Sequence, residues 1–226
     1  MKKNLLLLCT LFLFLVSCKK DKIIEPTTVT FIWPAGTSDY APHTLGSTFT
    51  FESATGTPVV IDSFTYTVVK DTTINALPFK KLTSNKPALG PTYFANTTNG
   101  VVTNISYNVN LQGFTVPVIT QTILKDNVIV NTTWSETQNI TAQGFTVPVT
   151  FTYTLMQNNF TKMILGKDYN NSIYVKQIVS IPAQIAALLG IAASNQVDNY
   201  FAKGVGLTER TGAGSTVKIK RYTIVK

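Results

Sequence analysis

Apolar and polar residues alternate along several stretches of the chain, and this alternation constrains the fold more than any other feature of the sequence. Between Phe145 and Leu155 every second residue is large and apolar, and the residues between them are threonines and one proline. A period of two places alternate side chains on opposite faces of a β-strand. The pattern therefore predicts strands with one apolar face and one polar, solvated face, as in antiparallel sheets.

The same alternation recurs along most of the chain. It is clear in Asn104–Leu111, and 35 of the 226 residues are threonine, which favours a pleated surface because its side chain is β-branched. About a dozen strands are expected, joined by short turns. They include Phe49–Phe51, Val59–Val69, Ile74–Leu82, Val128–Trp134, Phe160–Leu165, Ile173–Ile181, Tyr200–Thr208 and Thr216–Val225. We therefore predict an all-β, mainly antiparallel fold, either a curved meander sheet or an open half-barrel.

Two kinds of local signal interrupt the strands. Asp126-Asn127 and Gln157-Asn158-Asn159 are expected at hairpin tips, because Asn tolerates positive φ. Residues 182–193 have apolar residues at helical spacing after Pro182, which suits a first helical turn, and so predict one short helix. Two interpretations of this helix remain open: it plugs one end of the apolar face, or it is a movable lid over a lipid-sized cavity.

One heptad, QGFTVPV, occurs twice, at Gln112–Val118 and Gln143–Val149. Together with weaker similarities at a spacing of about one hundred residues, it is consistent with two related halves, 29–111 and 112–226, although coincidence remains equally open. Pro117 and Pro148 cannot donate a ladder hydrogen bond, so each strand is expected to be bulged or unpaired there, near the rim of the sheet.

The N-terminus has the features of a secretory signal. Lys2 and Lys3 precede an apolar segment, Leu5–Val16, that is too short to span a bilayer, which needs about 20 residues. The sequence Leu15-Val16-Ser17-Cys18 resembles a bacterial lipobox. The resemblance implies cleavage between Ser17 and Cys18 and attachment of lipid, including acyl chains such as palmitate, to Cys18. The expected organisation is a signal peptide at 1–17, a lipidated tether at 18–28 and a β domain at 29–226.

Three further segments, Thr44–Phe51, Asp71–Asn75 and Tyr200–Leu207, resemble recurrent signatures of uncharacterised lipoproteins of Bacteroidota. This resemblance implies a β architecture and a place in the cell envelope, anchored most naturally to the outer membrane. Whether the protein faces the surface or the periplasm remains open, as does glycosylation of Thr72, which lies in a short motif of that phylum.

The charge of the chain does not indicate a nucleic-acid partner. The formal net charge of +8 becomes +6 when residues 1–17, with two lysines and no acid, are removed. The basic residues are scattered, except beside the lipid anchor and near the C-terminus. The membrane, contacted through the anchor, is the expected partner, and the oligomeric state is left open.

The sequence contains no constellation of residues for catalysis, metal binding or a cofactor. His43 is the only histidine, lies in a turn-like stretch and is expected to be exposed, while the eleven acidic residues are dispersed. Both cysteines, Cys9 and Cys18, lie in the signal or at the anchor. We therefore expect neither an enzyme nor a bound cofactor, although two distant acids of a glycan hydrolase cannot be recognised from sequence alone.

Three functions remain as hypotheses. The first is a non-catalytic, lipid-anchored binding module for a hydrophobic ligand, a glycan or a partner protein, because uncovered apolar surface marks a binding site. The second is a structural or adhesion scaffold, and the third is an unrecognised glycan hydrolase. The residues expected to contact a ligand are Trp134, Tyr107 and Tyr153, and Trp33, Trp134, Tyr93 and Tyr107 are those to test for glycan stacking.

Overall fold

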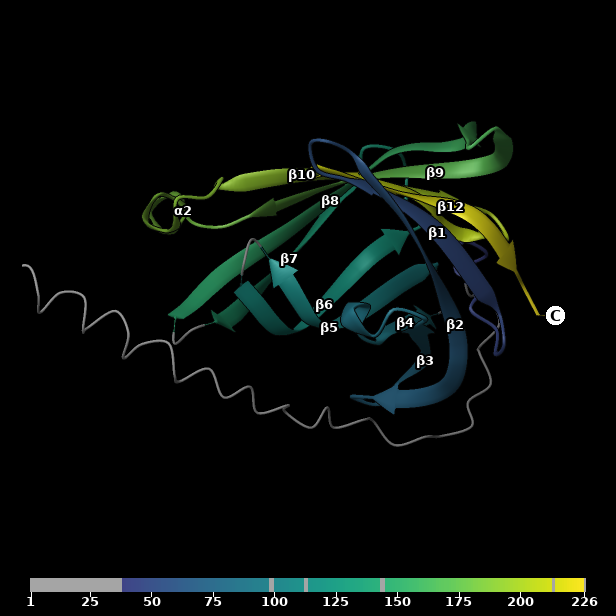
Figure 1. The fold of residues 1–226 in the computed structure, drawn as a ribbon, viewed down its shortest axis with the longest axis horizontal. Coiled ribbons are helices and arrows are strands. Elements are labelled where there is room, and N and C mark those ends of the chain that lie inside the picture. Colours follow the sequence, from purple (N-terminus) through teal and green to yellow (C-terminus); the bar gives the residue numbers. More distant parts are fainter. Residues whose placement is uncertain (1–37, 98–99, 112–113, 143–144, 213, 226) are drawn as a thin grey trace, which may run out of the picture.

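The computed structural model describes residues 38–225, apart from 98–99, 112–113, 143–144 and 213 (Figure 1). The signal peptide, Ser17, Cys18, the tether at 18–28 and Trp33 lie outside the described residues. The expectations about them therefore stay predictions.

The described chain forms one antiparallel sheet of twelve strands, with a 3₁₀ helix and a short α-helix in its connections. The strands are β1 (Thr48–Thr55), β2 (Val60–Ile74), β3 (Leu77–Ser84), β4 (Thr92–Thr97), β5 (Val101–Leu111), β6 (Phe114–Lys125), β7 (Thr133–Ala142), β8 (Phe145–Ile164), β9 (Lys167–Ser180), β10 (Ser194–Ala202), β11 (Gly206–Gly212) and β12 (Ser215–Thr223). The helices are η2 (Pro87–Leu89) and α2 (Ala183–Leu189). The predicted all-β antiparallel fold with one short α-helix is confirmed.

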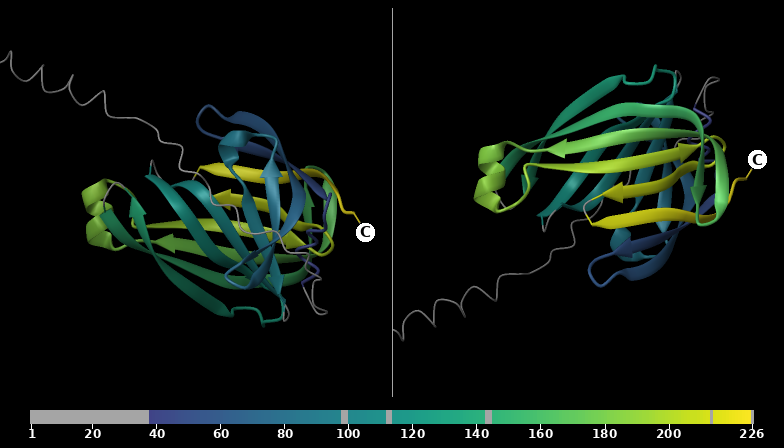
Figure 2. Two further views of the ribbon diagram at one scale, coloured as in Figure 1. Left: turned by 90° about the horizontal axis from the view of Figure 1, so that it is seen from below. Right: turned by 90° about the horizontal axis from the view of Figure 1, so that it is seen from above.

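The sheet curls into a nearly closed barrel (Figure 2). Except for β6 and β7, strands that are consecutive in the chain pair with each other, and β1 also pairs with β12, so the ladder runs from β6 through β1 and β12 to β7. The two edge strands, β6 and β7, are therefore consecutive in the chain. The predicted division at residue 111 falls in the β5–β6 hairpin, within this continuous sheet, and two related halves stay a prediction.

The edge strands face each other across a seam that side chains bridge. The β7 side chains of Glu136 and Gln138 accept hydrogen bonds from the backbone N–H groups of Thr122 and Thr120, each at 3.1 Å. Gln138 Nε2 donates to the Thr120 carbonyl, and Trp134 Nε1 donates to the Thr122 carbonyl at 2.7 Å. These bonds occupy edge groups of β6 that a backbone ladder would otherwise use.

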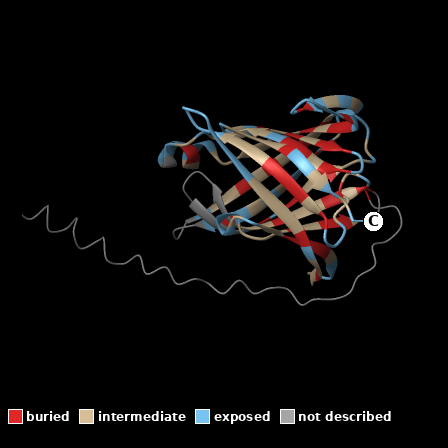
Figure 3. Ribbon diagram, turned by 45° about the vertical axis from the view of Figure 1, so that its right-hand side comes forward, coloured by how far each residue is buried: buried red, intermediate tan, exposed pale blue. Residues whose placement is uncertain are grey.

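The alternating sequence of β8 explains how the sheet forms its core (Figure 3). Val149, Phe151, Tyr153 and Leu155 are all at most 5% exposed and join the largest apolar cluster. The intervening threonines lie on the outer face, where hydroxyl pairs bridge β7 and β8. These pairs are Thr133–Thr154, Thr137–Thr150 and Thr141–Thr146, with oxygens 2.9–3.1 Å apart. Cross-strand hydroxyl pairs of this kind stabilise a sheet.

Several predicted boundaries differ from the structure. Tyr200–Thr208 is not one strand: β10 ends at Ala202 and β11 begins at Gly206, with Gly204 in the turn at φ +72°. Val128–Trp134 is mostly turn, because Asn131 takes φ +70° and β7 begins only at Thr133. β8 continues through Gln157–Asn159, so no hairpin tip lies there. Asp126-Asn127 does lie in a turn, but not at a hairpin tip, because the flanking strands β6 and β7 are not paired in the described sheet.

Pro148 leaves the β7–β8 register intact. It pairs with Asn139 in an uninterrupted ladder, so the predicted bulge is absent from this pair. On the other side of β8, pairing with β9 begins only at Thr150. At Pro148, β8 is therefore paired with β7 alone. Proline has no N–H group to donate to a second neighbouring strand, so it is tolerated at such a position.

Residues 38–47 close one end of the barrel, which we call the closed end. Asn96 Nδ2 on β4 donates to the carbonyls of Ser38 and Ala41 at 2.8 and 3.1 Å. The N–H of Gly204, in the β10–β11 turn, donates to the Asp39 carbonyl at 2.8 Å. The segment is therefore tied to both sides of the barrel.

Helix α2 projects beyond the strands between β9 and β10 (Figure 1). Ala186 is 2% exposed, whereas Leu188 is 82% exposed. Gly190 ends the helix in the left-handed conformation, at φ +64°. The apolar face of the sheet is thus covered by the curl of the sheet itself. None of the described helices is long and apolar enough to cross a membrane.

Candidate functional site

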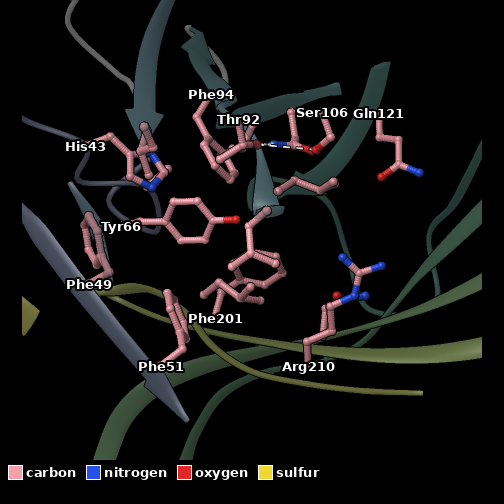
Figure 4. A pocket seen from close by; sticks show the side chains of 18 of the residues that line it. His43, Phe49, Phe51, Tyr66, Thr92, Phe94, Ser106, Gln121, Phe201 and Arg210 are labelled. Atoms are coloured by element: carbon pink, nitrogen blue, oxygen red, sulfur yellow. Dashed lines mark hydrogen bonds between the residues drawn. The ribbon is translucent and has the colours of Figure 1, made fainter. Parts of the chain in front are cut away.

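The barrel encloses a cavity of about 410 Å³ that has an apolar half and a polar half (Figure 4). Towards the closed end it is lined by Phe49, Phe51, Phe94, Phe201, Val205 and Leu207. Away from that end it is lined by Asn104, Ser106, Gln121, Gln177, Asn199 and Arg210. On β5, for example, Val102, Asn104 and Ser106 follow one another away from the closed end, and all three face the cavity.

The cavity reaches the surface beside η2. The strands β3 and β4 stop at this short helix, whereas β2 and β5 extend past it on either side. Ala88 and Leu89 of η2 line the cavity and are exposed, Leu89 by 43%. This notch in the wall provides an entrance from the side of the polar half.

Among the described residues that line the cavity, Arg210 carries the permanent charge and none is acidic. It lies on β11 opposite Asn199 of β10. Its side chain has accessible surface although protein surrounds the guanidinium, and it lines the cavity. Burial lowers the pKa of the guanidinium, and the Tyr153 hydroxyl opposes this weakly. Arginine remains charged at neutral pH in such surroundings.

A hydrogen-bonded row of side chains approaches Arg210 across the sheet. Asn199 Nδ2 donates to Gln177 Oε1 at 3.4 Å, and Gln177 Nε2 donates to the Tyr153 hydroxyl at 3.3 Å. Burial raises the pKa of Tyr153, so this hydroxyl stays protonated. The row fixes the orientation of both amides beside the guanidinium.

A second polar network lies on the β4–β5 wall. Asn104 Nδ2 donates to Thr92 Oγ1 at 2.7 Å, and Ser106 Oγ donates to Asn104 Oδ1 at 2.9 Å. All three side chains line the cavity. Alternation had placed Asn104 and Ser106 on a solvated face, and the structure places them in the interior.

Several polar groups of the cavity lining have no hydrogen-bond partner among the described residues. Among the described residues, none forms a hydrogen bond or ion pair with the side chains of Arg210, Gln121 or Tyr66, and all three line the cavity. Burial raises the pKa of Tyr66, whose hydroxyl points into the space between the two halves (Figure 4). Polar groups inside proteins normally have partners, so these three are available to a ligand.

His43 belongs to the cavity, which corrects its predicted exposure in a turn. Its ring lies 4.5 Å from that of Phe94 and 5.5 Å from that of Phe49, measured between centroids. Burial, with a smaller effect of nearby Lys80, lowers the pKa of His43 to about 3. The imidazole is therefore neutral at physiological pH.

The structure separates the three predicted contact residues. Tyr107 lines the cavity beside the entrance. Trp134 and Tyr153 do not line it: their rings stack at 5.6 Å near the seam, and both are at most 8% exposed. Tyr153 is linked to the cavity through Gln177. Contact of the three with a ligand stays a prediction.

Other predicted sites have these positions. Tyr93 is fully buried, which removes it from the candidates for surface glycan stacking. Thr72 is fully buried as well, so a glycan could not be attached to it in the folded protein. Within the described ranges, the structure brings no group of three His, Cys, Asp or Glu side chains together as metal ligands would be.

The fold resembles that of a known structure. A candidate lipoprotein from Parabacteroides distasonis aligns with 81% of this chain and 98% of its own, with a TM-score of 0.51 and 10% identity. A candidate exported protein with a YmcC-like fold from Bacteroides fragilis aligns with 86% of this chain and 100% of its own, at a TM-score of 0.38 and 9% identity. No protein-family model and no curated protein matches the chain.

Proposed function

We propose that this protein is a non-catalytic, lipid-anchored protein of the cell envelope that binds a hydrophobic ligand inside its barrel. The observation that carries the proposal is the cavity of about 410 Å³, which lies within the usual range of about 300–1,000 Å³ for small-molecule sites. None of the described side chains of helix α2 lines the cavity, which supports an interior that is left for a ligand.

The place in the envelope, most naturally at the outer membrane, rests on the lipobox-like sequence that ends at Cys18. The P. distasonis neighbour, itself described as a candidate lipoprotein, is in keeping with this location. A non-catalytic function is supported by the described part of the cavity lining, which combines a neutral histidine with no carboxylate.

Calorimetric titration with dodecanol tests ligand binding. The full chain carries Cys18→Ala, so that its own lipid does not compete for the site. We expect dodecanol to bind, and Ser106→Phe to weaken binding about tenfold or more, because the ring would occupy the cavity. The matched control is Ser135→Phe, on the exposed outer face of β7, which should bind as the parent does. If the parent binds neither dodecanol nor its charged counterpart dodecanoate, the proposal is removed.

The alternative is an adhesion scaffold that binds glycans on the outer face. Tyr174 and Tyr200 stack there with their centroids 4.8 Å apart, and Lys162 Nζ lies 4.0 Å from the Tyr200 ring centroid. Aromatic rings of this kind can stack on sugars. Glycan binding that is lost in Tyr174→Ala, in a protein that does not bind dodecanol, would favour this alternative.

A further inference from the structure

We infer that the cavity selects amphipathic anions: Arg210 binds a carboxylate or phosphate head group, and the apolar chain of the ligand extends towards the closed end. This inference rests on the proposed function, because it specifies the ligand of the same cavity. Its basis is the separation of the charged and apolar linings.

Arg210 is positioned to bind the head group of a ligand. Its guanidinium faces the cavity and forms no hydrogen bond or ion pair with any described residue. An unpaired charge surrounded by protein is costly, whereas a carboxylate or phosphate can accept two parallel hydrogen bonds from a guanidinium. A bound anion would therefore supply the partner that the protein does not.

Neighbouring polar groups complete the head-group site. Asn199, opposite Arg210 in the ladder, is held by its bond to Gln177, and the unpartnered amide of Gln121 lies on the same side of the cavity (Figure 4). These groups supply hydrogen-bond donors without negative charge. They would solvate an anion and would not repel it, since none of the described lining residues carries a carboxylate.

The opposite half of the cavity suits an alkyl or similar apolar chain. Phe49, Phe94 and Phe201 line it, and the segment that closes the barrel contributes Ala41. His43 adds a neutral ring to this half, so it contributes no second charge. A ligand with its head at Arg210 and its tail among these rings matches both linings, whereas a small free anion would leave the apolar half empty.

Three probes separate the contributions of charge and chain: dodecanoate, dodecanol and inorganic phosphate. They are titrated into the full chain with Cys18→Ala. We expect dodecanoate to bind about tenfold or more tightly than dodecanol, because charge-assisted hydrogen bonds are roughly twice as strong as neutral ones. In Arg210→Gln this preference should disappear while dodecanol binding persists. Arg221→Gln, which changes the chain's other arginine on the exposed side of β12, should retain the preference.

The outcomes distinguish this inference from the proposed function. If neither dodecanol nor dodecanoate binds, the proposed function fails, and this inference with it. If dodecanol binds as tightly as dodecanoate, or if Arg210→Gln retains the preference, only the inference is overturned. Phosphate binding as tightly as dodecanoate would also overturn it, because the apolar chain would then contribute nothing. Arg210→Lys, which keeps the charge, should retain part of the preference for dodecanoate. That result would show that loss of the preference in Arg210→Gln comes from loss of the charge and not from substitution at this position.

Discussion

His43 shows how the barrel interior alters the chemistry of a single residue. The ring is packed against Phe49 and Phe94, and burial lowers its pKa to about 3. In the unfolded chain the pKa of histidine is about 6.5. Between these two values the unfolded state binds more protons than the folded state, so the free energy of unfolding must fall as the pH is lowered.

We predict that this histidine makes the protein sensitive to mild acid. Between pH 7.5 and pH 5.0 the free energy of unfolding should fall by roughly 1–2 kcal/mol more in the parent than in His43→Phe, since a phenyl ring takes up no proton. Urea unfolding at both pH values measures the difference. The carboxylates titrate alike in the two proteins, so equal pH dependence would contradict the assigned pKa of His43.

Several residues of the cavity could not be recognised from the sequence, for a physical reason. Alternation of apolar and polar residues separates the two faces of a strand, and the polar face is then expected to face solvent. Asn104, Ser106 and Arg210 instead face a cavity. A polar cavity lining produces the same alternation in the sequence as a polar face in solvent does. Tyr107 was recognised as an aromatic candidate, but the buried Trp134 and Tyr153 were chosen on residue type alone.

At the scale of elements, the seam between β6 and β7 is the part of the barrel wall that depends on particular side chains. The side chains of Glu136 and Gln138 on β7 accept hydrogen bonds from backbone N–H groups of β6, which backbone carbonyls would accept in a ladder. Elsewhere around the described sheet, backbone ladders join the strands. Removal of one such side chain leaves an N–H group without its partner, whereas no ladder bond depends on side-chain identity.

We predict that Glu136→Ala weakens the seam. The Thr122 N–H loses a carboxylate acceptor, so the free energy of unfolding should fall by about 1.5–3 kcal/mol. Hydrogen exchange at the Thr122 amide should become faster than at paired amides of β8. Ser135→Ala, the preceding and exposed position of β7, is the matched control and should have little effect. Unchanged exchange at Thr122 would mean that the seam does not depend on Glu136.

The elements themselves were predicted better than their boundaries. Strong alternation identified β8, and helical spacing after Pro182 identified α2. The sequence predicts one strand over Tyr200–Thr208 because its glycines can mark a bulge within a strand, yet Gly204 supplies the positive φ of a hairpin. The residue types of Gln157–Asn159 are typical of a turn, but β8 continues through them to Ile164. Pairing with β9, which the local sequence does not encode, continues on both sides of this stretch.

At the scale of the whole molecule, closure of the sheet determines the site. An open half-barrel would leave its apolar face to be covered by α2 or by a partner. The pairing of β1 with β12 instead brings the first and last strands together, and the seam brings β6 to β7. The β1–β12 pairing joins strands far apart in sequence, and the β6–β7 seam depends on the curl of the whole sheet, so alternation alone leaves the choice between a meander sheet and a half-barrel open.

The predicted lipid anchor at Cys18 determines how the whole molecule associates with the membrane, and it can be tested independently of the barrel. We predict that Cys18→Ala abolishes incorporation of labelled palmitate and moves the protein from the detergent phase to the aqueous phase. Each buried CH₂ of an acyl chain contributes about 0.8 kcal/mol, so two or three chains hold a protein at a membrane and their loss releases it. The other cysteine offers the matched control: Cys9→Ala changes a residue within the predicted signal and should leave labelling intact. Palmitate labelling of Cys18→Ala would contradict the assignment of Cys18, whereas loss of labelling with an unchanged melting temperature would separate anchoring from folding.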